Sequence, residues 1–371
     1  MRVGLSTTTL CSDKHLGQLD GIGVYTQQIF QGLQSKDINL QAYNFSNKSK
    51  EEGGIYLGGF AAQLILSGVS NCPLLSSSKI DRNVDIFHAT DHYIPKLRKT
   101  PVVATIMDAI PLAHPEWVTD KHRKLKNWLF KKSAHWAEHI ITISEFSADT
   151  IAEQFEIPRT RISVVPLGVD EQYKVKLSEE IKKAVLARYQ LPDKYFLCIG
   201  TLQPRKNIER VINAFLQLPV TIQENHPLVI VGRHGWECDA LVERLLQLSK
   251  SKQNIRWLNY VSSTDKYALL QASQALVFAS LCEGFGLPIL EAFASNVPVI
   301  TSNITAMPEV AGDAAVLVDP YSEGEISEAM LSLVTDQGMV EKLQIKGKLR
   351  LAEFSWTKAV EQTINIYSKL I

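Results

Sequence analysis

The sequence has few cysteines and lacks long apolar runs, and both absences narrow its class. It holds five cysteines, an odd number, and no two of them have Cys-x-x-Cys spacing. Such usage is typical of reduced, mostly buried thiols in a cytosolic protein. No charged head followed by an apolar segment opens the chain, and no apolar run approaches the roughly 18 residues of a membrane span. We therefore expect a cytoplasmic protein without a secretory signal.

An excess of charge of either sign is also missing. Lysine plus arginine and aspartate plus glutamate both number 39, so the formal net charge is zero. This balance argues against a general nucleic-acid binder. Hydrophobic residues make up 45% and charged residues 21% of the chain, as in soluble globular proteins. A length of 371 residues favours two domains.

Three phosphate-binding or metal-binding signatures are absent. The chain has no G-x-x-x-x-G-K-[ST] loop and no G-x-G-x-x-G, so neither a P-loop enzyme nor a dinucleotide dehydrogenase is predicted. It also has no Asp-x-Asp pair, which is one common way to hold a metal–diphosphate complex. If the protein binds a diphosphate group, basic side chains would then have to neutralise its charge. We expect a metal-independent protein with no bound cofactor.

Short apolar runs alternate with longer amphipathic segments, which favours parallel sheets covered by helices on both faces. The predicted strands are Val102–Ile106, His139–Ile143, Ile162–Val165, Tyr195–Ile199, Leu228–Val231, Ala275–Ala279 and Val297–Thr301.

Proline and glycine mark a boundary between two α/β domains near residues 165–170. A charged helical segment from Leu177 to Tyr189 follows, and a new strand pattern begins at Tyr195. Ligands of open α/β sheets sit beyond the carboxyl ends of the strands. With two such domains, a cleft between them is a common binding site.

The stretch EGFGLPILE (283–291) places two carboxylates around a glycine loop. Pro288 predicts a helix that begins near Leu287, with Glu283 on the preceding loop and Glu291 in the first turn. Free N–H groups at such a helix start can face phosphate, and carboxylates can accept from paired sugar hydroxyls. The alternative is structural, because the helix dipole favours first-turn acids by about 0.3–1 kcal/mol.

A second strand–loop–helix pattern, CIGTLQPRKNIER (198–210), supplies the complementary charge. Arg205 and Lys206 stand at the predicted helix entry, and Asn207 is placed to cap that helix. Two cations beside a helix start favour a diphosphate ligand, although the same pair could be a solvated turn. Together the two stretches indicate a nucleotide-sugar site.

These residues resemble the E-x7-E motif of retaining glycosyltransferases of family 4, which have the GT-B fold, and within them bacterial O-antigen and exopolysaccharide mannosyltransferases. The similarity runs through GIGVYTQQI (21–29), MDAIPLAHPEW (107–117), IITISEFS (140–147), VVPLGVD (164–170), GTLQPRKN (200–207) and MPEVAGDAAVLVDP (307–320).

The resemblance implies two Rossmann-like domains with parallel sheets that face across a cleft. The first covers residues 1–172 and serves the acceptor, and the second, residues 173–354, binds the nucleotide sugar. A C-terminal helix, residues 355–371, would cross back onto the first domain, beginning at Ser355-Trp356.

The resemblance also implies roles for individual residues. Glu291 would hold the ribose hydroxyls, Glu283 a hydroxyl of the donor sugar, and Arg205 with Lys206 the diphosphate. The remaining implied donor contacts are the backbone of Gly284, Phe285, Gly286 and Leu287, a nucleobase loop at Tyr260, Val261 and Ser262, and an N-terminal loop containing Gly21 and Gly23.

One position departs from the family pattern. Many relatives have His-Asp where this chain has Met107-Asp108, and the family histidine contacts the donor sugar. A methionine cannot make that hydrogen bond, so the role would pass to Asp108 or to another group such as His88 or His114. Asp108 could equally be a helix cap, and a lone histidine such as His88 is more often structural.

Residues 121–136, KHRKLKNWLFKKSAHW, carry six lysines or arginines and two tryptophans. Leu125, Trp128, Leu129 and Trp136 fall near one face at helical spacing. A basic amphipathic helix of this kind suits an anionic membrane surface at the inner face of the cell membrane. The alternative is that its apolar face packs on the sheet and its charges are solvated.

The expected function is transfer of a hexose, with retention, from a nucleoside diphosphate sugar to a glycan or lipid-linked glycan. GDP-mannose is the expected donor, in cell-surface polysaccharide synthesis such as that of lipopolysaccharide. A UDP-sugar-dependent glucosyl- or N-acetylglucosaminyltransferase, a nucleotide-sugar epimerase on the same scaffold, and a non-catalytic sugar-binding module are the alternatives.

Overall fold

The computed structural model describes residues 1–11, 19–45, 54–92, 94–117, 122–250 and 254–371. It divides into two compact units. Unit 1 comprises Met1–Gly168 together with Ser355–Ile371, and unit 2 comprises Val169–Phe354. The chain leaves unit 1 after Gly168, four residues before the boundary at residue 172 that the sequence suggests.

Unit 1 is built on a parallel sheet whose strand order is β3-β2-β1-β4-β5-β6-β7. Its strands are β1 (Arg2–Ser6), β2 (Asn39–Asn44), β3 (Ile55–Tyr56), β4 (Ile86–Ala89), β5 (Val102–Thr105), β6 (His139–Thr142) and β7 (Ile162–Val164). Its α-helices are α1 (Gly21–Ser35), α2 (Phe60–Ser70), α3 (Ser77–Asp81), α4 (Ile110–Ala113), α5 (Arg123–Ala134), α6 (Glu145–Phe155) and α16 (Trp356–Leu370).

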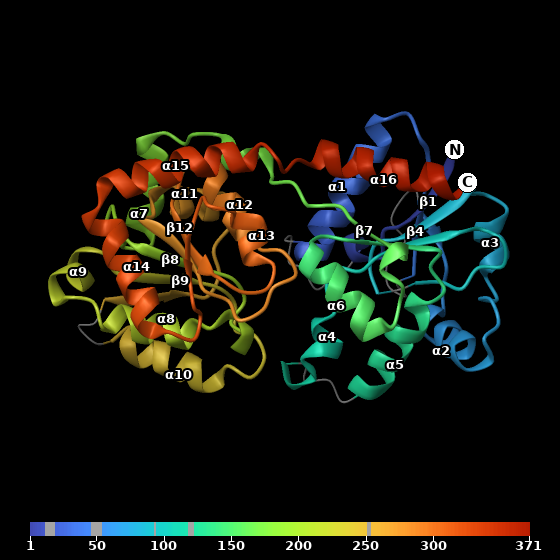
Figure 1. Cartoon of the computed structure of the whole chain (residues 1–371), viewed down its shortest axis with the longest axis horizontal. Helices are drawn as coiled ribbons and strands as arrows, with labels where there is room; N and C mark the ends of the chain where they lie inside the picture. The colour runs from blue at the N-terminus through green and yellow to red at the C-terminus, as the bar shows by residue number, and fades with distance from the viewer. Residues whose placement is uncertain (12–18, 46–53, 93, 118–121, 251–253) are drawn as a thin grey trace. The chain divides into compact units, whose positions relative to one another are not determined.

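The central strands of unit 1 are buried on both faces, which explains why they read as continuous apolar runs rather than as alternating ones. Helices α2, α5 and α6 cover one face, where their apolar side chains join one core cluster with β4, β5 and β6. Helices α1 and α16 lie together on the other face (Figure 1).

The last helix belongs to the first unit because its apolar stripe packs on α1. Ala359, Val360, Ile366 and Tyr367 of α16 are buried. A side chain at Gly168 would place its Cβ 2.2 Å from the backbone nitrogen of Trp356, so only glycine lets the end of the first segment pass the start of α16.

Unit 2 is built on a second parallel sheet, of strand order β10-β9-β8-β11-β12-β13. Its strands are β8 (Phe196–Ile199), β9 (Leu228–Val231), β10 (Ile255–Leu258), β11 (Ala275–Phe278), β12 (Val299–Ser302) and β13 (Val316–Val318). Its α-helices are α7 (Glu179–Arg188), α8 (Ile208–Leu216), α9 (Val220–Asn225), α10 (Asp239–Leu248), α11 (Ser263–Ala272), α12 (Leu287–Ala294), α13 (Met307–Ala311), α14 (Glu323–Thr335) and α15 (Gln337–Leu351).

Helices again cover both faces of this sheet. Figure 1 shows α8, α10 and α14 on one side and α7, α11, α12 and α15 on the other. The seven strands predicted from the sequence are all present, with ends that differ by at most two residues. The α/β class with two parallel sheets, each of the doubly wound Rossmann type, is therefore confirmed.

Each sheet has one point at which strand order reverses. In unit 2 this point lies between β8 and β11, and in unit 1 between β1 and β4. The loops that leave adjacent strands at such a point diverge to opposite faces, which opens a crevice at the carboxyl edge of the sheet. The two sequence stretches singled out for chemistry follow β8 and β11, so the fold brings them together.

Candidate active site

Arg205 and Lys206 lie in a single 3-10 turn, Pro204–Lys206, between β8 and α8. Glu283 lies on the loop between β11 and α12. The two loops are joined directly, because the Leu281 backbone N–H donates to the Arg205 carbonyl at 2.7 Å. Side chains that are 77 and 78 residues apart in sequence thereby meet at one edge of the sheet.

Glu283 accepts from both cations. Lys206 Nζ lies 2.5 Å from Oε1, and Arg205 Nη1 lies 2.5 Å from Oε2. Arg205 also donates to the Cys282 carbonyl at 3.1 Å. The Glu283 side chain is 11% exposed and that of Lys206 13%. Two cations face one carboxylate, so this partly buried cluster carries one net positive charge.

The cluster keeps Glu283 ionised. Burial alone would raise the pKa of Glu283, but the charges of Lys206 and Arg205 outweigh it and hold that pKa below its usual range. Burial also lowers the pKa of Lys206, which Glu283 opposes and Arg205 reinforces. The Lys206 ammonium further lies 4.9 Å over the Phe278 ring, a cation–π contact that steadies it.

Two glycines give this site its backbone shape. Gly286, directly before α12, has φ +106°, and Gly200, at the end of β8, has φ +145°. Residues that have a side chain rarely adopt either of these backbone conformations. A Cβ at Gly286 would also lie 3.1 Å from Ile289. The predicted role of Gly286 in a close backbone approach is consistent with this geometry.

Helix α12 begins at Leu287 with Pro288 in its first turn, as predicted. Glu291 is the fifth helical residue, so its placement in the first turn was wrong. Its carboxylate lies 2.9 Å from Lys266 Nζ of α11. Burial first, and then the charge of Glu291, raise the pKa of Tyr173, whose hydroxyl hydrogen-bonds Glu291.

The structure thus pairs the two glutamates with different cations. Glu283 contacts Arg205 and Lys206, whereas Glu291 is balanced by Lys266. The Lys266 ammonium also lies 5.4 Å over the Tyr173 ring. Sequence reasoning missed Lys266 and Tyr173, because neither stands in a glycine loop or a charged motif.

Asn207 does not cap α8 as predicted. It has φ +59° and makes no capping hydrogen bond. Its buried amide instead donates to the carbonyls of Ala279 at 2.9 Å and Pro320 at 2.7 Å. The side chain therefore ties the β8 loop to the chain segments after β11 and β13, because a capping geometry would leave those buried carbonyls unpaired.

The remaining predicted donor residues of unit 2 surround the same edge. Gly284 and Phe285 are buried, and the Phe285 ring packs edge-on against Phe354, with ring centroids 5.8 Å apart. Leu287 opens α12, and Val261 is buried just before α11.

Gly21 and Gly23 form the first turn of α1, so the prediction that they form a loop was wrong. Asp20 caps this helix by accepting from the Gly23 N–H at 2.8 Å. A Cβ at Gly21 would meet nothing within 4 Å. Since α1 follows β1 at the reversal point of its sheet, these residues still occupy its ligand-binding edge.

Asp108 follows β5 and accepts from the Ile110 N–H at 3.0 Å, a local turn that leads into α4. Asp108 is not the N-cap of α4, because Ala109 holds that position without a side-chain capping bond. Met107 is half-buried, and its carbonyl accepts from Thr142 at 3.5 Å. Both residues lie at the carboxyl edge of the sheet.

His88, on β4 of unit 1, is not placed to contact a donor sugar. Its ring is fully buried, with Nδ1 at 2.6 Å from the Tyr367 hydroxyl and Nε2 at 2.7 Å from Thr105. Burial lowers the pKa of His88 to about 3, so the ring is neutral. His114 instead stacks on Trp117, with ring centroids 4.0 Å apart, and contacts Glu116 at 3.0 Å.

The basic segment 121–136 forms helix α5 over Arg123–Ala134, while Lys121 lies outside the described residues. Its buried face consists of Leu129, Phe130, Ser133 and Ala134. Leu125 and Trp128 are more than 40% exposed, so the predicted apolar face is only partly the one that packs on the sheet.

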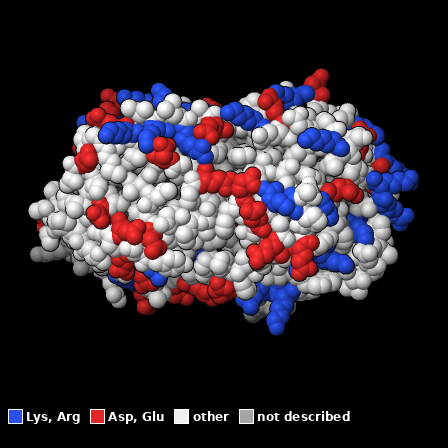
Figure 2. Space-filling view, viewed as in Figure 1, with Lys and Arg blue, Asp and Glu red and all other residues white. Residues whose placement is uncertain are grey.

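Within the described ranges, no three histidine, cysteine, aspartate or glutamate side chains gather in a way that could hold a metal ion. No helix in the same ranges is both long and apolar enough to traverse a bilayer. Acidic and basic side chains are interspersed over the face of the molecule in Figure 2.

Both units match families of known proteins. Residues 19–173 match the family described as Glycosyltransferase Family 4, and residues 179–350 match Glycosyl transferases group 1. O-antigen chain mannosyltransferase B of Escherichia coli is 36% identical over 290 residues, which cover 77% of this chain and 74% of that protein.

Two further proteins support the assignment. Serotype-specific mannosyltransferase WbdA of Escherichia coli is 30% identical over 277 residues, which cover 72% of this chain and 33% of WbdA. The structure of Anabaena Alr3699/HepE in complex with UDP and glucose superposes with a TM-score of 0.75 at 15% identity and covers 99% of both chains. This chain belongs to glycosyltransferase family 4, whose members have the GT-B fold, and is a glycosyltransferase.

Proposed function

We propose that this glycosyltransferase moves mannose from GDP-mannose to a hydroxyl of a lipid-linked glycan during synthesis of a cell-surface polysaccharide such as an O-antigen. The protein would act in the cytoplasm, at the inner face of the cell membrane. The reaction would proceed with retention at the anomeric carbon and without a metal ion.

The positive charge of the Arg205–Lys206–Glu283 cluster carries the proposal. Two cations at one edge of the sheet favour an anionic ligand, because charge-assisted hydrogen bonds to phosphate oxygens are strong. It stands at the reversal point of the sheet, where nucleotides bind in folds of this type. Both cations would donate to a diphosphate, and its departure from the sugar is the step that most needs cations.

Acceptor oxygens for the rest of the donor lie on α12 and the loop before it. The Glu291 carboxylate, held by Lys266, would accept from the ribose hydroxyls. Glu283 retains lone pairs beyond the two that its cations occupy and would accept from a sugar hydroxyl. The backbone of residues 284–287 would line the sugar, while Gly21, Gly23 and Val261 would complete the donor contacts.

The mechanism follows from where charge develops. As the glycosidic bond breaks, the anomeric carbon becomes oxocarbenium-like and the diphosphate oxygen becomes negative. Arg205 and Lys206 stabilise that oxygen, which then takes the proton of the acceptor hydroxyl as it attacks from the same face. Asp108 would contact the transferred sugar in place of the family histidine. A sugar trapped covalently on a side chain would contradict this mechanism.

Mannose is favoured by the names of two relatives at 36% and 30% identity, both mannosyltransferases. A UDP-sugar is the second candidate, because the HepE structure holds UDP and glucose. The identities of the nucleobase and of the sugar are therefore the first properties to determine.

A thermal-shift screen with GDP-mannose, UDP-glucose, UDP-N-acetylglucosamine and an ADP-sugar tests the donor. A ligand at about a hundred times its Kd stabilises the fold by about 2.7 kcal/mol, and GDP-mannose should give the largest shift. A larger shift with a UDP-sugar would overturn the choice of GDP-mannose.

Incubation with the bound donor then tests the reaction. Release of nucleoside diphosphate that depends on a glycan acceptor, and that survives a chelator, supports metal-independent transfer. Conversion of the donor to an epimer without an acceptor would establish an epimerase instead. Stabilisation by a donor with no turnover under any acceptor would indicate a sugar-binding module.

A further inference from the structure

Helix α2 exposes apolar side chains that the described residues of unit 1 leave largely uncovered. Ile65, Leu66 and Val69 on this helix are 40%, 51% and 74% exposed, and Leu75, shortly after it, is 75% exposed. Single exposed apolar residues are ordinary, but four within eleven positions are typical of an interaction surface.

This apolar surface continues onto α5. The two helices pack at Gly68, where a Cβ would lie 2.9 Å from Leu129 and 3.2 Å from the Trp128 ring. The exposed side chains of Leu125 and Trp128, 44% and 43% exposed, therefore stand beside α2. We call the six residues Ile65, Leu66, Val69, Leu75, Leu125 and Trp128 the α2–α5 patch.

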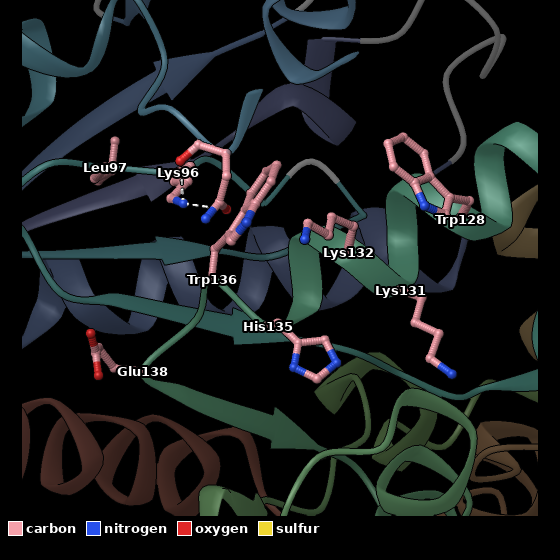
Figure 3. A pocket seen from close by; sticks show the side chains of 9 residues that line it. Lys96, Leu97, Trp128, Lys131, Lys132, His135, Trp136 and Glu138 are labelled. Carbon is pink, nitrogen blue, oxygen red and sulfur yellow. Dashed lines mark hydrogen bonds between the residues drawn. The ribbon is translucent and has the colours of Figure 1, made fainter. Parts of the chain in front are cut away.

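A basic pocket of about 740 Å³ adjoins the α2–α5 patch. It is lined by Asn71, Lys96, Leu97, Trp128, Lys131, Lys132, His135, Trp136 and Glu138. Figure 3 shows Lys132 between the indole rings of Trp128 and Trp136. The lining contains three lysines and one glutamate, so it has an excess of positive charge.

The three lysines differ in the partners that they already have. Lys131 pairs with Glu156 at 2.7 Å, and Lys96 donates to Asn71 at 2.5 Å. Lys132 has no acidic partner in the described part of the chain, and it is partly buried. Lys96 also lacks an acidic partner among the described residues, but its ammonium already donates to the neutral Asn71 amide, so Lys132 retains the most donors for an external anion.

Within unit 1, the pocket lies at the opposite end of the sheet from Asp108 and the start of α1. Lys96 and Leu97 precede β5, and Glu138 directly precedes β6, so these residues lie at the amino ends of their strands. Asp108 and α1 follow the carboxyl ends. A ligand here would therefore not occupy the edge of the sheet at which Asp108 and the start of α1 lie.

We propose that the α2–α5 patch and this pocket together dock the protein on an anionic phospholipid bilayer. The apolar residues of α2 enter the interface, the Trp128 ring sits at headgroup depth, and Lys132 binds a lipid phosphate. The proposal extends the basic segment 121–136 to a second helix and does not depend on which sugar is transferred.

Sedimentation with vesicles tests this docking, with no nucleotide or acceptor present. The full-length protein should bind vesicles of equal parts phosphatidylcholine and phosphatidylglycerol and should bind pure phosphatidylcholine far less. Lys132→Gln should weaken binding about fivefold, and the double variant Leu66→Ser, Val69→Ser about tenfold or more. Unchanged melting curves would show that both variants fold.

Matched substitutions in unit 2 serve as controls. Ile345 and Leu349 of α15 are also exposed and lie one turn apart, so Ile345→Ser, Leu349→Ser should leave vesicle binding intact. Lys250→Gln is the control for charge. Equal loss in these controls, or binding that ignores lipid charge, would refute the docking surface.

A soluble headgroup distinguishes a bilayer-docking site from a site for a soluble anion. Glycerophosphoglycerol, the headgroup without acyl chains, should neither displace the protein from vesicles nor shift its melting temperature at millimolar concentration. If it does both, and the α2 double variant binds vesicles normally, the pocket takes a soluble anion and the bilayer proposal is wrong.

Discussion

Lys206 is held in a partly buried cluster in which two cations share a single carboxylate. Both cations also face the edge of the sheet at which a diphosphate is proposed to bind, so we expect them to contact its oxygens. The contact of Lys206 with Glu283 in the absence of donor also fixes the ammonium in advance, which lowers the entropy that binding would otherwise cost.

Lys206→Ala should lower kcat/KM for the nucleotide sugar about 10- to 100-fold or more. Charge-assisted hydrogen bonds contribute about 1.5–3 kcal/mol each, and about 1.4 kcal/mol corresponds to a tenfold rate change. Steady-state kinetics with the donor identified by thermal shift measures this loss.

Lys182→Ala is a matched control for that variant. Lys182 is 15% exposed and pairs with Glu179 at 2.5 Å in the same unit, on a helix that carries none of the proposed donor contacts. It should retain full activity. If Lys206→Ala is as active as Lys182→Ala, the diphosphate role of Lys206 is wrong.

At the scale of elements, the contact between α1 and α16 determines where the end of the chain packs. Gly32 of α1 faces Val360 of α16 so closely that a Cβ at Gly32 would lie 2.3 Å from Val360 Cγ2. The amphipathic pattern of the last helix shows that it needs a partner, but only this close helix–helix fit identifies α1 as that partner.

Gly32→Ala should therefore destabilise unit 1 by about 1–3 kcal/mol through overpacking. Val360→Ala should relieve the clash, so the double variant should be more stable than Gly32→Ala alone. Chemical denaturation of all three variants gives the coupling energy. Strict additivity of the two changes would show that α16 does not pack on α1 in solution.

Helix α5 shows how tertiary packing divides an amphipathic pattern. Leu125, Trp128 and Leu129 follow one another at helical spacing, so the sequence groups them. Leu129 and Phe130 are buried, whereas Leu125 and Trp128 stay exposed, and α2 contacts Leu129 and Trp128 closely at Gly68.

At the scale of the molecule, a buried histidine links the sheet of unit 1 to the last helix. His88 on β4 contacts Tyr367 on α16 and Thr105 on β5, and the Tyr25 hydroxyl contacts the same Thr105 at 2.8 Å. The ring must stay neutral, because burial lowers its pKa to about 3.

Stability should consequently depend on pH below neutrality. An unfolded histidine titrates near 6.5, so between about pH 6.5 and 3 the unfolded chain binds a proton that the folded chain does not. His88 by itself should contribute about 1.4 kcal/mol per pH unit to the fall in the free energy of unfolding in this window as the pH is lowered.

Denaturation of wild type and His88→Gln at several pH values tests this slope. The variant should be less stable at neutral pH but should lose less stability on acidification. Tyr367→Phe, which keeps the histidine, should retain the wild-type slope. A slope that His88→Gln leaves unchanged would mean that His88 is not the titrating group.

The sequence by itself determined the alternation of strands and helices, the seven strands named in advance, the start of α12 and the two loops that carry Arg205, Lys206 and Glu283. These features depend on local signals, such as apolar runs, Pro288 and glycines, which the chain expresses within a few residues.

Only the tertiary structure decided which groups meet. It paired Glu291 with Lys266 rather than with the basic turn, buried His88 beneath α16, directed the Asn207 amide to two carbonyls, and left the α2–α5 patch uncovered. Each outcome depends on strand order and helix approach, which bring together residues up to 279 positions apart and have no local signature in the sequence.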